Sequence, residues 1–154
     1  MTAQLATKES TKTLLLESGI EIMLEKGYNN TGIMDFSGGS AIVGNVVTGN
    51  LVVGAFVTGA TDVVGNAFYG NFATALRLVN SFSGSVAKNN FVGNDPFLNC
   101  ALQLTVVPSA TATNNYWGAP TGPGADPADT TCNGTVTTTP FATRPFNVKA
   151  SIKP

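Results

Sequence analysis

Four segments of the chain carry the same short pattern, in which an Asn is followed two positions later by a large apolar residue and two positions after that by a Gly. The repeated Asn residues are separated by 21, 23 and 25 positions and are Asn45, Asn66, Asn89 and Asn114. The apolar residues are Val47, Phe68, Phe91 and Tyr116, and the Gly residues are Gly49, Gly70, Gly93 and Gly118. Periods of this length with turn residues at fixed places indicate a solenoid, in which each repeat forms one coil.

Each repeat also contains two short segments of strand-like alternation. One segment precedes the Asn and places in one column Ile42, Val63 and Val86. The other lies earlier in the repeat, with alternate apolar residues at Met34/Phe36, Ala55/Val57, Leu76/Leu78 and Leu102/Leu104. A single coil is too thin to bury these side chains, but stacked coils turn each column into a continuous core. The sequence therefore predicts that these columns, and the column that ends in Tyr116, face inward.

The repeated Asn residues are predicted to form an asparagine ladder. Asn tolerates the left-handed backbone of a tight turn, and its side-chain amide both donates and accepts hydrogen bonds. Amides that recur about every 4.8 Å along a stack of coils can bond to one another along the axis. We therefore expect Asn45, Asn66, Asn89 and Asn114 to have a structural role.

The first 32 residues differ from the repeats in charge and in periodicity. They hold seven charged side chains, against ten in the 122 residues that follow. One helical face collects Leu16, Ile20, Met23 and Leu24. Ser10 or Thr11 can cap the start of this helix, and Gly27 can end it. The pattern predicts an amphipathic helix over residues 10–26, which would cover the unpaired strand edges at the open end of a solenoid.

The predicted fold is an all-β, right-handed parallel β-helix solenoid of about four coils with an N-terminal amphipathic capping helix. It divides the chain into a cap at residues 1–32, coils at residues 33–118 and a Pro/Gly-rich closing segment at residues 119–154. The closing segment is the candidate cover for the second end. Where the ends are covered poorly, coils of two chains can stack, so end-to-end self-association is a further expectation.

Two parts of the chain resemble known families. The coils and the tail "NNYWGAPTGPGADPADTTCNGTVTTTPFATRPF" make residues 34–146 similar to the right-handed parallel β-helix of pectate-lyase-like proteins, which contain an internal asparagine ladder. The segment "TKTLLLESGIEIMLEKGYNNTGI" makes residues 8–33 resemble the first helix of tetracycline-repressor-type transcription regulators, with matches at Lys26-Gly27-Tyr28 and Thr31. The DNA-recognition helices of that family have no counterpart in the chain. The pair of resemblances is typical of a chimera, whether natural or engineered.

The composition argues against several function classes. The chain contains no His, which is the commonest general base and metal ligand. A formal net charge of −1 gives no basic field, so nucleic acid is not an expected partner. No apolar run approaches the roughly 20 residues of a membrane span, so a membrane is not expected either. The start, "MTAQLATKESTK", lacks the features of a secretory signal, although the coils are of an extracellular or cell-surface type.

The acidic residues are not expected to form a catalytic site. Polysaccharide-cleaving enzymes use paired carboxylates, whereas Asp35, Asp62 and Asp95 fall in different columns. Asp126 and Asp129 lack the oxygen spacing and terminal Glu of an EF-hand loop. The two Cys residues have no partners at metal-binding spacing. We therefore predict no catalytic residues, no metal site and no cofactor.

One set of outward-facing positions supplies candidate ligand-binding residues. Arg77 lies between Leu76 and Leu78, so its side chain is expected to point away from the core. Phe56 and Gln103 hold the equivalent places in neighbouring coils. Such a strip can bind a sugar through stacking on Phe56 and hydrogen bonds from Arg77 and Gln103.

A second outward column contains two aromatic residues, Tyr69 and Trp117, with Val92 between them. Aromatic faces suit carbohydrates, so both residues are candidates for ligand binding. Trp117 has an alternative place beneath the Pro-rich tail, and we favour that interpretation.

The two Cys residues, Cys100 and Cys132, can form one disulfide or remain as two buried thiols, and both options stay open. For the whole chain, the predicted function is a non-catalytic structural or binding β-helix module, as a fusion or a fragment of a larger secreted surface protein. The alternative is a polysaccharide-binding or polysaccharide-modifying domain, with polysaccharide as its partner. A second alternative is the remnant of a transcription regulator without DNA-binding competence.

Overall fold

A computed structural model of the chain describes residues 32–35 and 38–148. The helix predicted at residues 10–26, and nearly all of the regulator-like segment at residues 8–33, lie outside the described residues. Phe36 also lies outside them.

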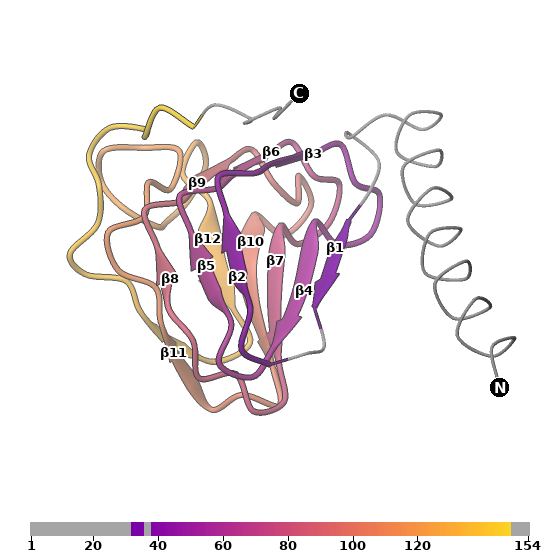
Figure 1. Cartoon of the computed structure of the whole chain (residues 1–154). Coiled ribbons are helices and arrows are strands. Elements are labelled where there is room, and N and C mark those ends of the chain that lie inside the picture. The colour runs from indigo at the N-terminus through magenta and orange to yellow at the C-terminus, as the bar shows by residue number, and fades with distance from the viewer. Residues whose placement is uncertain (1–31, 36–37, 149–154) are drawn as a thin grey trace, which may run out of the picture.

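The described residues form an all-β parallel solenoid of about four turns (Figure 1). The strands are β1 (Ile33–Asp35), β2 (Ala41–Val43), β3 (Val46–Thr48), β4 (Ala55–Thr58), β5 (Asp62–Val64), β6 (Ala67–Tyr69), β7 (Leu76–Val79), β8 (Val86–Ala87), β9 (Asn90–Val92), β10 (Cys100–Thr105), β11 (Ser109–Thr111), β12 (Thr130–Cys132) and β13 (Thr135–Thr137). They make sheets in the orders β1-β4-β7-β10-β12, β2-β5-β8, β3-β6-β9 and β11-β13. Each strand pairs in parallel with the equivalent strand of the next coil, which confirms the predicted all-β parallel solenoid of about four coils.

Neighbouring coils pair in the register that the sequence columns predict. The aligned residues are Ile42–Val63–Val86, Val47–Phe68–Phe91 and Ala55–Leu76–Leu102. All of these side chains are buried and belong to one apolar core. The core is continuous because each coil covers the apolar residues of the next one.

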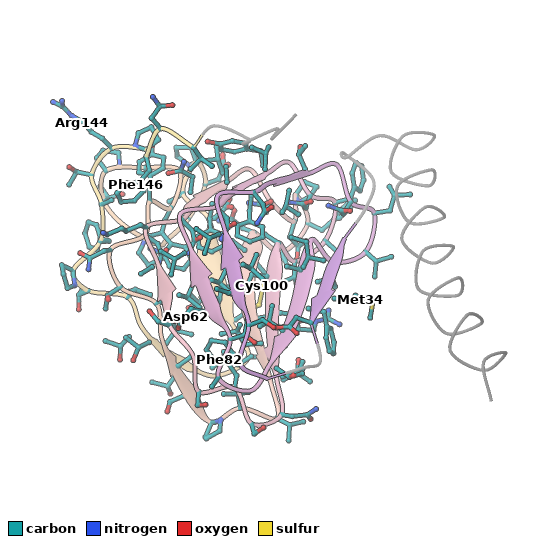
Figure 2. All side chains as sticks on the ribbon, in the orientation of Figure 1. Met34, Asp62, Phe82, Cys100, Arg144 and Phe146 are labelled. Atoms are coloured by element: carbon teal, nitrogen blue, oxygen red, sulfur yellow. A yellow bond between two sulfur atoms is a disulfide. The ribbon has the colours of Figure 1, made fainter. Side chains whose placement is uncertain are left out.

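The first coil departs from the predicted register. Ile33, rather than Met34, pairs with Ala55, so Met34 shares a column with Phe56. The predicted inward position of Met34 is therefore wrong: its side chain is 68% exposed and points away from the coils (Figure 2). Successive side chains of a strand alternate between its two faces, so a shift of one residue turns Met34 outward.

The aromatic column ends in Trp117 rather than in Tyr116. Phe91 stacks between Phe68 and Trp117, with ring centroids 5.2 and 4.9 Å away. Trp117 is fully buried. Tyr116 is half-buried and pairs with Asn90 through an isolated parallel bridge. The predicted core position of Tyr116 is wrong, and so is the outward position considered for Trp117; the favoured alternative, in which Trp117 is covered, agrees with its burial.

The last repeat is displaced by one residue, because Asn114 takes the left-handed position before the ladder rather than the ladder position itself. In the first three coils the residues before the ladder Asn all have positive φ, and they are Gly44, Gly65 and Lys88. Asn114, with φ 57°, holds the same place in the last coil. Asn115 is therefore the ladder member, 26 residues after Asn89, and the prediction of Asn114 was wrong. Asn adopts this conformation more readily than most residues, so Asn114 can replace Gly there.

Strands continue past residue 118, the predicted end of the coils. β12 pairs with β10, and β13 pairs with β11. Cys100 in β10 and Cys132 in β12 form a disulfide, with Cα atoms 5.9 Å apart. Beyond β13, the side chain of Asn90 donates to the carbonyl of Phe146 (2.9 Å) and accepts from its N–H (2.8 Å). These bonds attach the tail to the coils.

Candidate functional site

The first asparagine ladder runs through Asn45, Asn66, Asn89 and Asn115. Each Nδ2 donates to the Oδ1 of the next member at 3.0–3.1 Å. The same Oδ1 also accepts the backbone N–H of the preceding member. The remaining Nδ2 hydrogen goes to a backbone carbonyl, as from Asn66 to Ile42 (2.7 Å) and from Asn89 to Val63 (2.8 Å). The ladder therefore satisfies its buried amides and holds the coils in register.

A second ladder, which was not predicted from the sequence, lies at the turn after β3, β6 and β9. Its members are Asn50, Asn71, Asn94 and Asp129, and the successive Nδ2–Oδ distances are 2.8, 2.8 and 2.6 Å. A signal was present, because an Asn directly follows Gly49, Gly70 and Gly93. The fourth member breaks the period, since Asp129 lies 35 residues after Asn94 and is not an Asn.

Asp129 is a carboxylate at a position where the ladder otherwise uses an amide. It is fully buried, and its oxygens accept the Nδ2–H of Asn94 at 2.6 Å and the N–H of Asn94 at 3.2 and 3.3 Å. Burial raises the pKa of Asp129 from 3.8 to about 6; the hydrogen bonds from Asn94 oppose this rise, and the nearby charge of Asp126 adds to it. Asp129 is therefore a buried carboxyl group whose proton affinity is raised by the fold.

Three other carboxylates accept hydrogen bonds that serve local structure. Asp35 accepts the hydroxyl of Thr61 at 2.6 Å, and Asp62 accepts the N–H of Ser85 at 2.9 Å. Asp95 accepts the N–H of Leu98 at 3.1 Å. Within the described ranges, no three His, Cys, Asp or Glu side chains gather where they could hold a metal ion.

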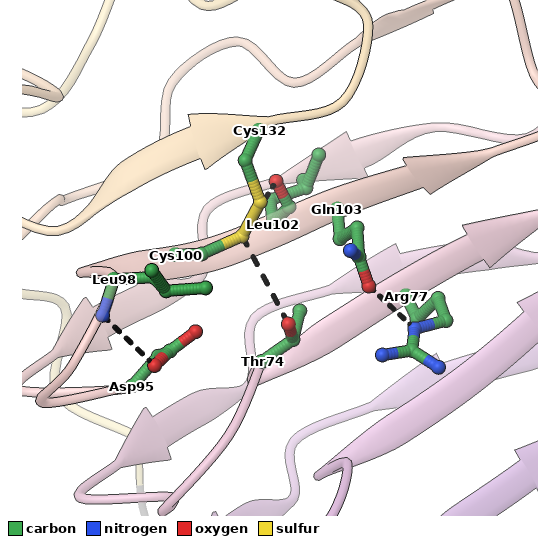
Figure 3. The surroundings of a disulfide bond; sticks show 8 residues. All are labelled: Thr74, Arg77, Asp95, Leu98, Cys100, Leu102, Gln103 and Cys132. Carbon is green, nitrogen blue, oxygen red and sulfur yellow. Dashed lines mark hydrogen bonds between the residues drawn. A yellow bond between two sulfur atoms is a disulfide. The ribbon is translucent and has the colours of Figure 1, made fainter.

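The predicted strip on the large sheet is brought together in the structure. Phe56 pairs in register with Arg77, and Arg77 with Gln103, on strands β4, β7 and β10. All three side chains are half-buried. The Nε–H of Arg77 donates to Oε1 of Gln103 at 2.6 Å (Figure 3). Met34 and Cys132 continue the column at its two ends. The strip is therefore a column of half-buried side chains in which Arg77 and Gln103 are polar and Phe56 is aromatic.

The second predicted aromatic surface does not form. Tyr69 is half-buried beside Val92 on the sheet β3-β6-β9, and its hydroxyl accepts the Nδ2–H of Asn90 at 3.3 Å. Trp117 lies in the core and offers no surface to a ligand. Its place as a binding residue is therefore rejected, because the shift in the last coil turns its side chain inward.

A ridge of exposed apolar side chains was also missed. It lies on the turns that follow β3, β6 and β9 and consists of Leu51, Val52, Phe72, Phe97 and Leu98, which are 56–79% exposed. The rings of Phe72 and Phe97 have centroids 6.3 Å apart. Apolar residues immediately after a turn Asn were the available signal, as at Leu51 and Phe72.

No protein-family model matches the chain, and no significant similarity exists to a curated protein or to a solved structure. In the part of the chain that the structure describes, no helix has the length and apolar character needed to cross a membrane.

Proposed function

We propose that the chain is a non-catalytic structural module, a right-handed β-helix of the pectate-lyase-like kind whose rigid coils carry binding surfaces. The observation that supports this proposal is that the buried polar side chains form hydrogen bonds to one another. The two ladders bond buried amides and the buried carboxyl group of Asp129 to one another along the axis. Networks in which buried polar groups bond to one another stabilise a unique core.

We further propose that residues 1–32 cover the N-terminal end of the solenoid. Among the described residues, β1, β2 and β3 lie at the ends of their sheets, so each leaves one strand edge without a neighbour. Open edges of this kind promote association between chains. The apolar helical face predicted at residues 10–26 would cover them.

A chain reduced to residues 33–154 is expected to aggregate, or to melt at least about 5 °C below the full chain, because its first edges lose their cover. Light-scattering mass and thermal melting measure this, with a chain lacking only residues 1–9 as the matched control. A shortened chain that remains monomeric and equally stable would reject the cap. It would leave the structural role of the ladders untouched.

Polysaccharide binding is a second candidate function, and the strip of Phe56, Arg77 and Gln103 favours it. Parallel pairing in register places the three side chains in one column of the sheet β1-β4-β7-β10-β12. The bond to Gln103 orients the guanidinium of Arg77, whose remaining N–H groups can donate to sugar hydroxyls. The ring of Phe56 supplies an apolar face for stacking.

Arg77→Ala is expected to weaken binding of an extended glycan at least about tenfold, because a hydrogen bond from a charged donor is lost. A glycan array would identify the ligand, and calorimetry would compare the variants. Arg144→Ala is the control, because Arg144 is exposed on the tail (Figure 2) and belongs to no strand of the sheet that carries the strip. If no glycan binds, or if both variants bind equally, the polysaccharide proposal fails.

A further inference from the structure

We propose that Asp129 makes the closure of the last coil depend on pH: its neutral carboxylic acid completes the second ladder and fastens the closing loop (residues 118–129), and loss of its proton weakens this attachment. The inference concerns the stability of the fold and requires no ligand. It therefore goes beyond the proposed structural and binding roles.

The lower rungs of the ladder indicate where a proton on Asp129 would be donated. The amide of Asn71 gives its second hydrogen to the carbonyl of Val47 (3.1 Å), and Asn94 does the same to Phe68 (3.0 Å). In the register of the strands, the next carbonyl in this series is that of Phe91. A carboxylic acid has an O–H to donate at such a place, whereas a carboxylate only accepts.

The groups around Asp129 offset its negative charge only in part, because burial outweighs the hydrogen bonds from Asn94 and Gly93. Asn94, on the turn packed against it, supplies neutral donors, and the next residue on that turn, Asp95, is another acid. Asp126, on the same loop as Asp129, adds a further negative charge. Cys132 in β12 carries no charge, because its sulfur is held in the disulfide. With a pKa of about 6, the carboxyl group is mainly neutral at pH 5 and mainly charged at pH 7 in the folded protein.

The backbone of Asp129 is a fixing point of the closing loop. Its N–H donates to the carbonyl of Trp117 at 2.7 Å, and its carbonyl accepts the N–H of Gly124 at 3.2 Å. Nδ2 of Asn99 donates to the carbonyls of Gly124 and Ala128 at 2.9 and 2.5 Å. Weakening at Asp129 is therefore transmitted to this loop, while the disulfide of Cys132 still holds β12 to β10.

The direction of the pH effect follows from the two states of the chain. In the unfolded chain the carboxyl group loses its proton near pH 3.8, and in the folded protein near pH 6. The extra stability of the protonated folded state is therefore complete below pH 3.8 and is lost as the pH rises through 6. A difference of about two pKa units corresponds to about a hundredfold change in the unfolding equilibrium.

The test compares the full chain with Asp129→Asn by thermal and urea unfolding between pH 3.5 and 8. Asn supplies the amide of the lower rungs and does not titrate. We expect the unfolding constant of the natural chain, relative to the variant, to rise about a hundredfold across this range. Asp126→Asn is the control, because this exposed residue on the same loop should leave most of the pH dependence in place.

Two further measurements locate the effect. In the natural chain, the backbone amides of the closing loop should exchange faster at pH 7.5 than at pH 5, after correction for intrinsic rates. In Asp129→Asn, the corrected exchange rates should be equal at the two pH values. The side-chain carbonyl carbon of Asp129 should titrate near pH 6 by NMR, a readout that needs no variant. Parallel pH profiles of the two chains, or a titration near pH 4, would overturn the proposal.

Discussion

Asn89→Ala is expected to lower the free energy of unfolding by at least about 3 kcal/mol. Asn89 is fully buried, and its side chain takes part in four hydrogen bonds. Truncation leaves the N–H and amide of Asn66 and the carbonyl of Val63 without these partners. Each buried polar group left unpaired costs about 1–3 kcal/mol. Urea unfolding followed by circular dichroism measures the loss.

Asn45→Ala is the matched control for this prediction. Asn45 is the same residue type in the first rung, but it is half-buried, and its side chain makes two hydrogen bonds, to Val43 and Asn66. Water can replace these partners, so the expected loss is below about 1.5 kcal/mol. Equal losses in the two variants would show that position within the ladder does not matter, and the ladder would then not be the source of the stability.

The stacking of the coils could be predicted from the sequence because the columns repeat a physical requirement. Only apolar residues satisfy the core, so Val63–Val86 and Phe68–Phe91 stand in register in the sequence as they do in the structure. The last coil could not be placed in this way. Asn is suited both to the ladder and to the left-handed turn before it, so the pair Asn114-Asn115 allows two registers.

The candidate sites divide in the same way, into features that the repeat predicts and features that depend on tertiary contacts. The strip of Phe56, Arg77 and Gln103 was predicted, because alternation along a strand fixes which side chains face outward. The rung formed by Asp129 was not, because it comes from a loop whose path depends on tertiary contacts with Asn94 and Trp117. A loop residue that does not stand at the repeat spacing is not aligned with any column of the sequence, so its place in the ladder cannot be predicted from the repeats.

Trp117→Ala is expected to lower the free energy of unfolding by about 3–5 kcal/mol. The indole is fully buried and stacks on Phe91 at the end of the aromatic column. Removal of the indole leaves a cavity against Phe91. The closing loop, which begins directly after Trp117, also loses this apolar anchor. Urea unfolding measures the loss, and near-ultraviolet circular dichroism reports on the aromatic stack.

Two further variants show whether the loss of stability in Trp117→Ala comes from the loss of the buried ring. In Trp117→Phe the ring stack is kept, and the buried indole N–H, which has no hydrogen-bond partner in the described structure, is removed, so a loss below about 1.5 kcal/mol is expected. In Tyr116→Ala a half-buried ring and one hydrogen bond to the carbonyl of Gly118 are lost, at a cost of about 1–2 kcal/mol. If Tyr116→Ala proved more harmful than Trp117→Ala, the last coil would have the register with Asn114 in the ladder. Asp129 would then be displaced from its place above Asn94, because its N–H is bonded to the carbonyl of Trp117.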